Sequence, residues 1–253
     1  MTLSAESPAS GKTLAVVLCA GQGTRMGAAQ NKVFLPLAGA PVAAHAVAAF
    51  ERSPLVDEII VVAHPDELGR IREEIIARYG FAKVSAVLAG GASRHQSEER
   101  ALDALRARIE SGEIGLVMIH DGARPLTTTE AIARLAAAVR ALPQPGGALL
   151  VTPLEADERV ARVGADGVVE QVFAAAELAR AQTPQGFDAR TLLAAYDRAQ
   201  RDGFEGTDTA SVVEAIGAPV AVVTGDEDNI KVTTPDDLLR AEATLRARGG
   251  AAL

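Results

Sequence analysis

Short runs of consecutive apolar residues alternate along this chain with longer stretches in which apolar residues recur at helical spacing. The short runs predict β-strands, and their continuously apolar character is typical of parallel strands that helices cover on both faces. The predicted strands are residues 14–19, 58–63, 84–88, 116–120, 148–152 and 220–223. This alternation predicts an α/β fold, a Rossmann-like three-layer αβα sandwich around a mostly parallel sheet.

The stretches with helical spacing are rich in Ala, Leu and Ile on one face and carry their charges on the opposite face. They predict helices at residues 41–52, 66–79, 93–109, 128–141, 189–201, 207–216 and 235–248. Right-handed crossovers between parallel strands would place these helices on both sides of the sheet.

Two segments interrupt the alternation. Residues 20–36 are too long and too rich in glycine for a simple strand-to-helix turn. Residues 158–162 and 168–173 flank the sequence Gly164-Ala165-Asp166-Gly167, and an Asp-Gly turn between two alternating runs predicts a β-hairpin. We therefore expect one domain over residues 13–253, with residues 152–175 as a projecting arm and residues 1–12 as a disordered tail.

Composition excludes several classes of protein. The 253 residues carry a net charge of −8, include no Trp and two Tyr, and contain no basic run, so nucleic acid is not an expected partner. No window approaches the roughly 18 apolar residues of a membrane-spanning helix. The single cysteine, Cys19, predicts a small buried hydrophobic residue and a reducing compartment, so the expected location is the cytoplasm.

The loop after the first strand is the most informative segment. Its glycines, Gly21, Gly23 and Gly27, would let the backbone approach a phosphate closely, while Arg25 and Lys32 would neutralise a polyphosphate. The same glycines could serve only a tight turn, or a dinucleotide site of an oxidoreductase. A dinucleotide site, however, needs an acid at the end of the second strand, and none occurs before Asp66.

Six motifs in order carry a family resemblance that runs from Leu14 to Ala243. They are Ala20-Gly21-x-Gly23-x-Arg25-Met26 with Lys32, Gly90-Gly91-x-x-Arg94-x-x-Ser97, His120-Asp121-Gly122-Ala123-Arg124-Pro125, Gln182-Thr183-Pro184-Gln185-Gly186-Phe187, Thr207-Asp208-x-Ala210-Ser211 and Asp228-Asn229-Ile230-Lys231-Val232-Thr233. The chain resembles the 2-C-methyl-D-erythritol 4-phosphate cytidylyltransferases of isoprenoid biosynthesis and their relatives that activate ribitol 5-phosphate. That resemblance implies the fold of the nucleotide-diphospho-sugar transferases.

The resemblance also implies a role for individual residues. Ala20, Gly21, Gly23, Gly90, Gly91 and Ser97 would bind the nucleotide, with Gly91 and Ser97 reading cytosine. Lys32 and Lys231 would act on the α-phosphate and Arg25 on the β- and γ-phosphates. Asp121 would hold Mg²⁺ or the substrate, and Arg124, Thr183 and Thr207 would bind the polyol phosphate.

Several of these residues also have purely structural interpretations. Ser93 could cap the following helix, Thr207 and Asp208 could form a helix N-cap pair, and Asp121-Gly122 could be a simple turn. His120 is expected to be structural.

The implied reaction transfers CMP from CTP to 2-C-methyl-D-erythritol 4-phosphate, releases pyrophosphate and uses Mg²⁺, in a homodimer formed through the arm. The chain departs from the family pattern in that arm. The family's Pro-x-x-Asp-Thr-x-Lys becomes the sequence at residues 153–159, which lacks the Thr, and Ala175 replaces an Arg that binds the polyol phosphate. The acceptor could therefore be ribitol 5-phosphate or another polyol phosphate, or the chain could be a catalytically silent nucleotide-binding homologue.

Overall fold

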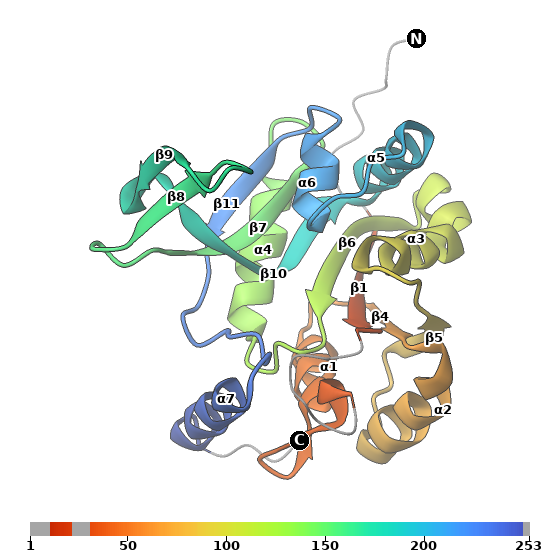
Figure 1. The fold of residues 1–253 in the computed structure, drawn as a ribbon. Helices are drawn as coiled ribbons and strands as arrows, with labels where there is room; N and C mark the ends of the chain where they lie inside the picture. The colour runs from red at the N-terminus through yellow and green to blue at the C-terminus, as the bar shows by residue number, and fades with distance from the viewer. Residues whose placement is uncertain (1–10, 22–30, 250–253) are drawn as a thin grey trace.

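A computed structural model describes residues 11–21 and 31–249, and its centre is a sheet of seven strands (Figure 1). Along the sheet the strands are β11 (Val220–Thr224), β7 (Gly147–Pro153), β10 (Ala179–Asp188), β6 (Ile114–Asp121), β1 (Lys12–Cys19), β4 (Glu58–Ala63) and β5 (Val84–Ala89). Neighbouring strands are parallel except where β10 pairs antiparallel with β6 and β7. The mostly parallel sheet predicted from the apolar runs is confirmed.

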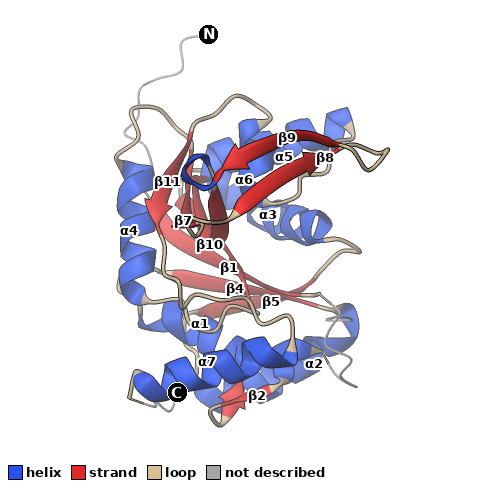
Figure 2. Ribbon diagram, turned by 60° about the vertical axis from the view of Figure 1, so that its left-hand side comes forward, coloured by secondary structure: helices blue, strands red, loops and turns tan. Residues whose placement is uncertain are grey.

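Helices cover both faces of this sheet, as Figure 2 shows for α4 and α3. On one face lie α1 (Val42–Arg52) and α4 (Thr129–Arg140), and on the other α3 (Arg94–Glu110), α5 (Ala189–Asp202) and α6 (Thr209–Glu214). Strand β1 serves both layers, because Leu14 and Val16 pack into one core while Ala15 and Val17 pack into the other. The result is the predicted three-layer sandwich.

Strand β10 was not predicted. Its sequence includes Thr183, Pro184 and two glutamines, which break the apolar run that identifies the other strands. The strand nevertheless lies between β6 and β7, and residues 182–187 are buried. Tertiary pairing has overridden a local pattern that favours a loop.

The predicted helix at residues 66–79 is wound in three ways. A 3-10 turn, η3 (Pro65–Glu67), leads into a single α-turn, α2 (Leu68–Arg70), and then into a π-helical segment, η4 (Ile71–Ala77). The wider winding still buries Ile71 and Ile75 against the core. The other predicted helices and strands agree with the structure to within two residues at each end; the helix predicted from residue 207, for example, begins at Thr209.

The remaining small elements lie next to α1 and α7 (Pro235–Ala247). The 3-10 turn η2 (Lys32–Phe34) precedes a two-stranded ribbon, β2 (Pro36–Leu37) and β3 (Ala40–Pro41), and Leu37 packs with Val232 and Ala241 in a third apolar cluster. Strand β1 begins at Lys12, inside the predicted tail, whose residues 1–10 lie outside the described part of the chain. Among the described residues, no helix is both long enough and apolar enough to cross a membrane.

The arm is the predicted hairpin. Strands β8 (Arg159–Val163) and β9 (Val169–Ala174) form a separate two-stranded sheet, which extends away from the main sheet and is followed by the 3-10 turn η5 (Ala175–Glu177) (Figure 1). At its tip Gly164 donates its N–H to the Val168 carbonyl at 2.8 Å. Gly167 adopts φ +80, a conformation that favours glycine, and so closes the turn.

Candidate active site

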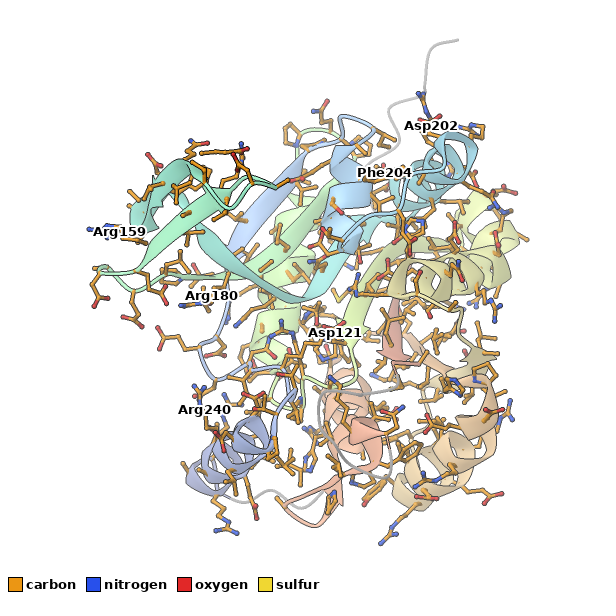
Figure 3. All side chains as sticks on the ribbon, in the orientation of Figure 1. Asp121, Arg159, Arg180, Asp202, Phe204 and Arg240 are labelled. Carbon is orange, nitrogen blue, oxygen red and sulfur yellow. The ribbon has the colours of Figure 1, made fainter. Side chains whose placement is uncertain are left out.

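A cleft of about 470 Å³ lies at the carboxyl ends of β1 and β6, the edge at which ligands bind in open α/β sheets. Figure 3 places Asp121 near the centre of the molecule, at the end of β6. The lining comes from the loops after β1 and β6, the start of α3, and the segment before α7. Its residues are Leu18, Cys19, Ala20, Gly21, Lys32, Val33, His64, Gly91, Ala92, Ser93, Arg94, Ser97, Asp121, Ala123, Lys231 and Thr233.

Glycines bring the strand ends together at the floor of this cleft. A Cβ atom at Gly122 would lie 2.4 Å from the Cys19 sulfur, and one at Gly90 would lie 2.4 Å from the Ala20 Cβ. Gly122 also donates its N–H to the Leu18 carbonyl at 2.9 Å. Gly90 therefore acts through close packing, whereas Ala20 lines the cleft itself.

Ser97 and Gly91, which were expected to read the base, are bonded to one another. The Ser97 hydroxyl accepts the Gly91 N–H at 3.1 Å and donates to the Ser93 carbonyl at 2.8 Å. Ser93 in turn caps α3 by accepting the Gln96 N–H at 3.2 Å, so its structural interpretation is confirmed. The turn that carries Gly91 into the cleft is thereby fixed.

Asp121 is the electrostatic centre of the site. Its side chain is only 11% exposed, yet Lys231 lies 2.7 Å from Oδ2, Arg94 lies 3.4 Å from Oδ1 and Arg124 lies 3.8 Å from Oδ2. Burial acts to raise the pKa of this carboxyl, but Lys231, Arg94 and Arg124 outweigh it and hold the pKa well below its usual value. Asp121 is therefore ionised throughout the neutral range, and the simple-turn interpretation does not account for three cations around it.

The backbone of Asp121 is held by Thr183. The Asp121 N–H donates to the Thr183 hydroxyl at 3.0 Å, and that hydroxyl lies 3.1 Å from Nδ1 of His120. Burial lowers the pKa of His120 to about 4, so the ring is neutral, and its Nε2 lies 3.1 Å from the Arg124 carbonyl. The Thr183 hydroxyl then donates to Nδ1 while Nε2 donates to the carbonyl. His120 has the structural role expected of it.

Lys231 reaches the cleft because its loop is fastened at two points. Asn229 is buried and donates its amide to the Thr183 carbonyl at 2.9 Å, while Arg124 donates to the Asn229 carbonyl at 2.7 Å. Val232 donates its N–H to the Ala123 carbonyl at 2.8 Å. Residues more than a hundred positions apart thus form one wall.

Lys32 is the first residue of the 3-10 turn η2. Its neighbour Asn31 donates to Glu67 at 2.8 Å and to the Cys19 carbonyl at 3.4 Å, and it caps η2 through the Val33 N–H at 3.3 Å. Lys32 and Lys231 therefore line one cleft, as the triphosphate hypothesis requires. Gly23 and Arg25, predicted for the same site, lie outside the described residues.

The residues expected to bind the polyol do not line the cleft. Thr183 is buried with its hydroxyl engaged as described, and the Arg124 side chain is 13% exposed. Thr207 is exposed and precedes Asp208, which caps α6 in a capping box with Ser211. The predicted cap pair therefore reduces to Asp208 alone.

Two residues with no predicted role join the site. Arg94 lines the cleft and bridges Asp121 to Glu98, which is 1% exposed on the same helix. Arg94 is part of the motif that runs from Gly90 to Ser97, so the sequence could have indicated its place in the site. Nothing local distinguishes Glu98 from a solvated acid on a charged helix.

Three arginines lie on the arm or next to it. Arg180 pairs with Glu158 and donates to the Pro153 carbonyl at 3.2 Å, and the Arg162 guanidinium lies 5.6 Å from the Phe173 ring centre. Arg159 lies out along the arm, well apart from Asp121 (Figure 3). Arg159 is paired with Ala174 across the hairpin and lines the same hollow as Ala175.

The donor set fits a Mg²⁺ ion held largely by substrate. Among the residues the structure describes there is no cluster of three or more potential metal ligands, and Asp121 is the one acid that lines the cleft. Mg²⁺ is commonly bound by one or two carboxylates together with substrate phosphates. A single ionised carboxylate in a cleft that Lys32, Arg94 and Lys231 also line matches that mode.

This chain is similar to known proteins over nearly its whole length. Residues 13–247 match the family model described as 2-C-methyl-D-erythritol 4-phosphate cytidylyltransferase. Curated proteins of that name are similar: the one from Geobacter metallireducens is 40% identical over 92% of this chain and 97% of its own length. The one from Geotalea uraniireducens is 42% identical over 93% and 97%.

Solved structures are similar over the same span. The 4-diphosphocytidyl-2C-methyl-D-erythritol synthase from Anaerococcus prevotii superposes with a TM-score of 0.78 at 26% identity, covering 93% of this chain and 96% of that one. The 2-C-methyl-D-erythritol 4-phosphate cytidylyltransferase from Thermus thermophilus gives a TM-score of 0.71 at 28% identity, covering 93% and 99%.

Proposed function

The chain belongs to the 2-C-methyl-D-erythritol 4-phosphate cytidylyltransferase family, and on that premise we propose that it transfers CMP from CTP to 2-C-methyl-D-erythritol 4-phosphate and releases pyrophosphate. Family membership makes it a CTP-dependent cytidylyltransferase. The observation that carries the assignment to this cleft is the convergence of Lys32 and Lys231 with Asp121 at the carboxyl edge of the sheet.

The chemistry asks for cations more than for a base. An oxygen of the acceptor phosphate attacks the α-phosphorus of CTP, a new P–O bond forms, and the bond to the β-phosphate oxygen breaks. Because the attacking oxygen is already ionised, the main obstacles are bringing two polyanions together and stabilising charge on the phosphorus in flight. Lys32 and Lys231 would act on the α-phosphate, and Arg25 would bind the β- and γ-phosphates.

Asp121 keeps Lys231 in place before the nucleotide arrives. Their 2.7 Å contact holds a flexible side chain that is 37% exposed. A pre-placed ammonium costs less to organise than one that must be drawn in from solvent. We also propose that Asp121 holds Mg²⁺, which when bound would neutralise phosphate charge.

The acceptor is the sharper question, because the arm lacks both family contacts. Loss of two charge-assisted hydrogen bonds weakens phosphate binding by roughly 3–6 kcal/mol if nothing replaces them. Ribitol 5-phosphate or another polyol phosphate is therefore the alternative acceptor. A silent nucleotide-binding homologue is the second alternative, favoured by Ala175.

Pyrophosphate release decides among these functions. The full chain is incubated with Mg²⁺ and each of the four nucleoside triphosphates, against 2-C-methyl-D-erythritol 4-phosphate, ribitol 5-phosphate and other polyol phosphates. Release only with CTP and methylerythritol phosphate supports the proposal. CTP binding without turnover of any acceptor supports the silent homologue, and NADH binding without pyrophosphate release would support the oxidoreductase.

We further propose that two copies associate through the arm in the cytoplasm. Five valines of the arm, Val160, Val163, Val168, Val169 and Val172, are between 40% and 60% exposed, an apolar surface that a second copy would cover. The single cysteine, which cannot form an internal disulfide, suits a reducing compartment.

A further inference from the structure

Glu98 is a carboxylate buried in the layer behind the cleft. It lies on α3 with 1% of its surface exposed, and its Oε1 lies 2.5 Å from Nη1 of Arg94. The Thr209 hydroxyl donates to Oε1 at 3.1 Å, and the Tyr196 hydroxyl donates to Oε2. Three elements, α3, α5 and α6, thus supply partners to one acid.

Arg94 connects that acid to the cleft. Its Nε lies 3.4 Å from Oδ1 of Asp121, and its Nη1 lies 3.3 Å from the Thr209 hydroxyl. The guanidinium is planar and presents its donors in a fixed fork, so holding one edge fixes the direction of the other. A relay therefore runs from Glu98 through Arg94 to the carboxylate that holds Lys231.

Such an acid is expensive for folding. Apolar residues that fill the volume of a buried ion pair are often as stable as the pair or more so. The surrounding layer is apolar, with Ala101, Leu102 and Ala195 buried in the same cluster. Burial raises the pKa of Glu98 to about 7 even though Arg94 acts to lower it. The fold thus contains an acid that it does not need for packing and that leads to the active site.

We propose that Glu98 is a positioning residue for nucleotidyl transfer: its carboxylate fixes Arg94 against Asp121 and so sets the direction in which Asp121 presents Lys231 to the nucleotide. This inference rests on the proposed function of the cleft. Glu98 itself does not line the cleft and so differs from the residues that would touch substrate.

Several groups face Glu98 from the elements around it. Arg94 lies on its own helix, Tyr196 on α5, Asp208 and Thr209 at the start of α6, and Asp121 at the end of β6. Protonation of Glu98 would leave a neutral acid that holds Arg94 less firmly. The wild-type enzyme should therefore lose its advantage over a Glu98→Gln variant as the pH falls below 7.

The experiment compares wild type, Glu98→Gln and Glu58→Gln between pH 5.5 and 9. Glu58 is the matched control, because it pairs with Arg108 at 2.6 Å at the opposite end of β4 from the cleft. We expect Glu98→Gln to lower kcat/KM about tenfold at pH 8.5, the cost of loosening one pre-placed charge, and to match wild type near pH 6. Glu58→Gln should follow wild type at every pH.

A second variant keeps the test independent of the folding of Glu98→Gln. Tyr196→Phe removes a hydroxyl that stabilises the charged form of Glu98 but leaves the Arg94 contact in place. The pH at which half of the kcat/KM advantage over Glu98→Gln is lost should then be higher than in wild type by about 0.5–1 pH unit. The inference is overturned if that pH is unchanged.

The outcomes separate this inference from the proposed function. An equal loss for Glu98→Gln at all pH values, with a lowered Tm, would show that Glu98 is only structural. Wild-type failure with every acceptor would contradict the proposed function alone. In that case CTP affinity is measured by calorimetry in the same proteins, and equal affinities of wild type and Glu98→Gln at pH 8.5 overturn the inference.

Discussion

The cleft and the arm of this protein are built in opposite ways. Around the cleft, Asp121 is 11% exposed and contacts three cations supplied by α3, the loop after β6 and the loop before α7. Along the arm, Val169 and Val172 are 53% and 58% exposed, and the Arg180–Glu158 pair lies in solvent at the base. One region is buried and charged, and the other is exposed and apolar.

The contrast separates two kinds of dependence. The cleft residues hold one another within one chain, so this half of the site is preorganised without help. The arm buries little of its apolar surface on its own body, which predicts that a second copy completes it. It also contains Ala175, where the family resemblance implies an Arg that binds the acceptor phosphate.

The largest effect is expected at Lys32. Replacing it by Ala removes one pre-placed cation from the α-phosphate and should lower kcat by about 10²–10³, with the fold intact. Steady-state pyrophosphate release and circular dichroism measure the two quantities. Lys12→Ala is the control, since Lys12 pairs with Glu113 at the far end of β1. Unimpaired turnover by Lys32→Ala would remove this residue from the mechanism.

Asp121→Asn tests whether the cleft is held by charge. Removing one partner of a buried network leaves the cations uncompensated and should lower the free energy of unfolding by about 3 kcal/mol at pH 7. The depressed pKa of Asp121 stabilises the fold above pH 3.8. The difference between wild type and variant should therefore shrink as the pH falls below that value.

Urea unfolding at several pH values measures the Asp121 effect. Asp197→Asn, which loses a pair with Arg106 whose side chains are 36% and 34% exposed, is the matched control and should cost less than about 1 kcal/mol. Equal losses in the two variants would mean that the network around Asp121 adds nothing special to stability.

Glu98 should affect stability and activity in opposite directions as the pH changes. Its pKa is about 7 in the folded chain against an ordinary value of 4.5, so the folded state binds more protons between these values. Relative to Glu98→Gln, wild-type stability should rise as the pH falls from 7 to 4.5, by at most about 1.4 kcal/mol per pH unit. Chemical unfolding over this range measures how the difference in free energy of unfolding between the two proteins changes with pH. A difference that does not change with pH would contradict a raised pKa for Glu98.

Substitutions in the arm should have the smallest effect on the stability of the sandwich domain. Val163 and Val169 are paired across the hairpin, and changing both to Glu should convert a dimer to a monomer. Once dissociation is accounted for, the stability of the sandwich domain should change by no more than about 0.5 kcal/mol, because both side chains are exposed. Light scattering measures the mass. Val222→Glu, at a valine 70% exposed on the sheet edge, should leave the mass unchanged.

The local sequence pattern was sufficient to predict elements whose side chains all lie in the same environment. The apolar runs at β4 and β6 identify buried strands because both faces of each strand meet helices, and the Asp-Gly turn identifies the hairpin because its φ requirement is local. Strand β10 was missed because Thr183 and Gln185 are polar. Their partners, Asp121 and Asp208, lie far away in the chain. The π-helical winding of η4 likewise has no local signal.

By itself, the sequence determined the sandwich, the arm and the glycine-lined edge, together with the motifs that carry Lys32, Asp121 and Lys231, since these follow from periodicity, turn chemistry and short-range spacing. Only the tertiary structure decided that Thr183 supports the Asp121 backbone and that Glu98 is a buried acid behind Arg94. Both facts depend on which distant side chains meet in a medium where charge is costly. Coulombic and desolvation energies are set by distance and burial, and neither can be read from position along a chain.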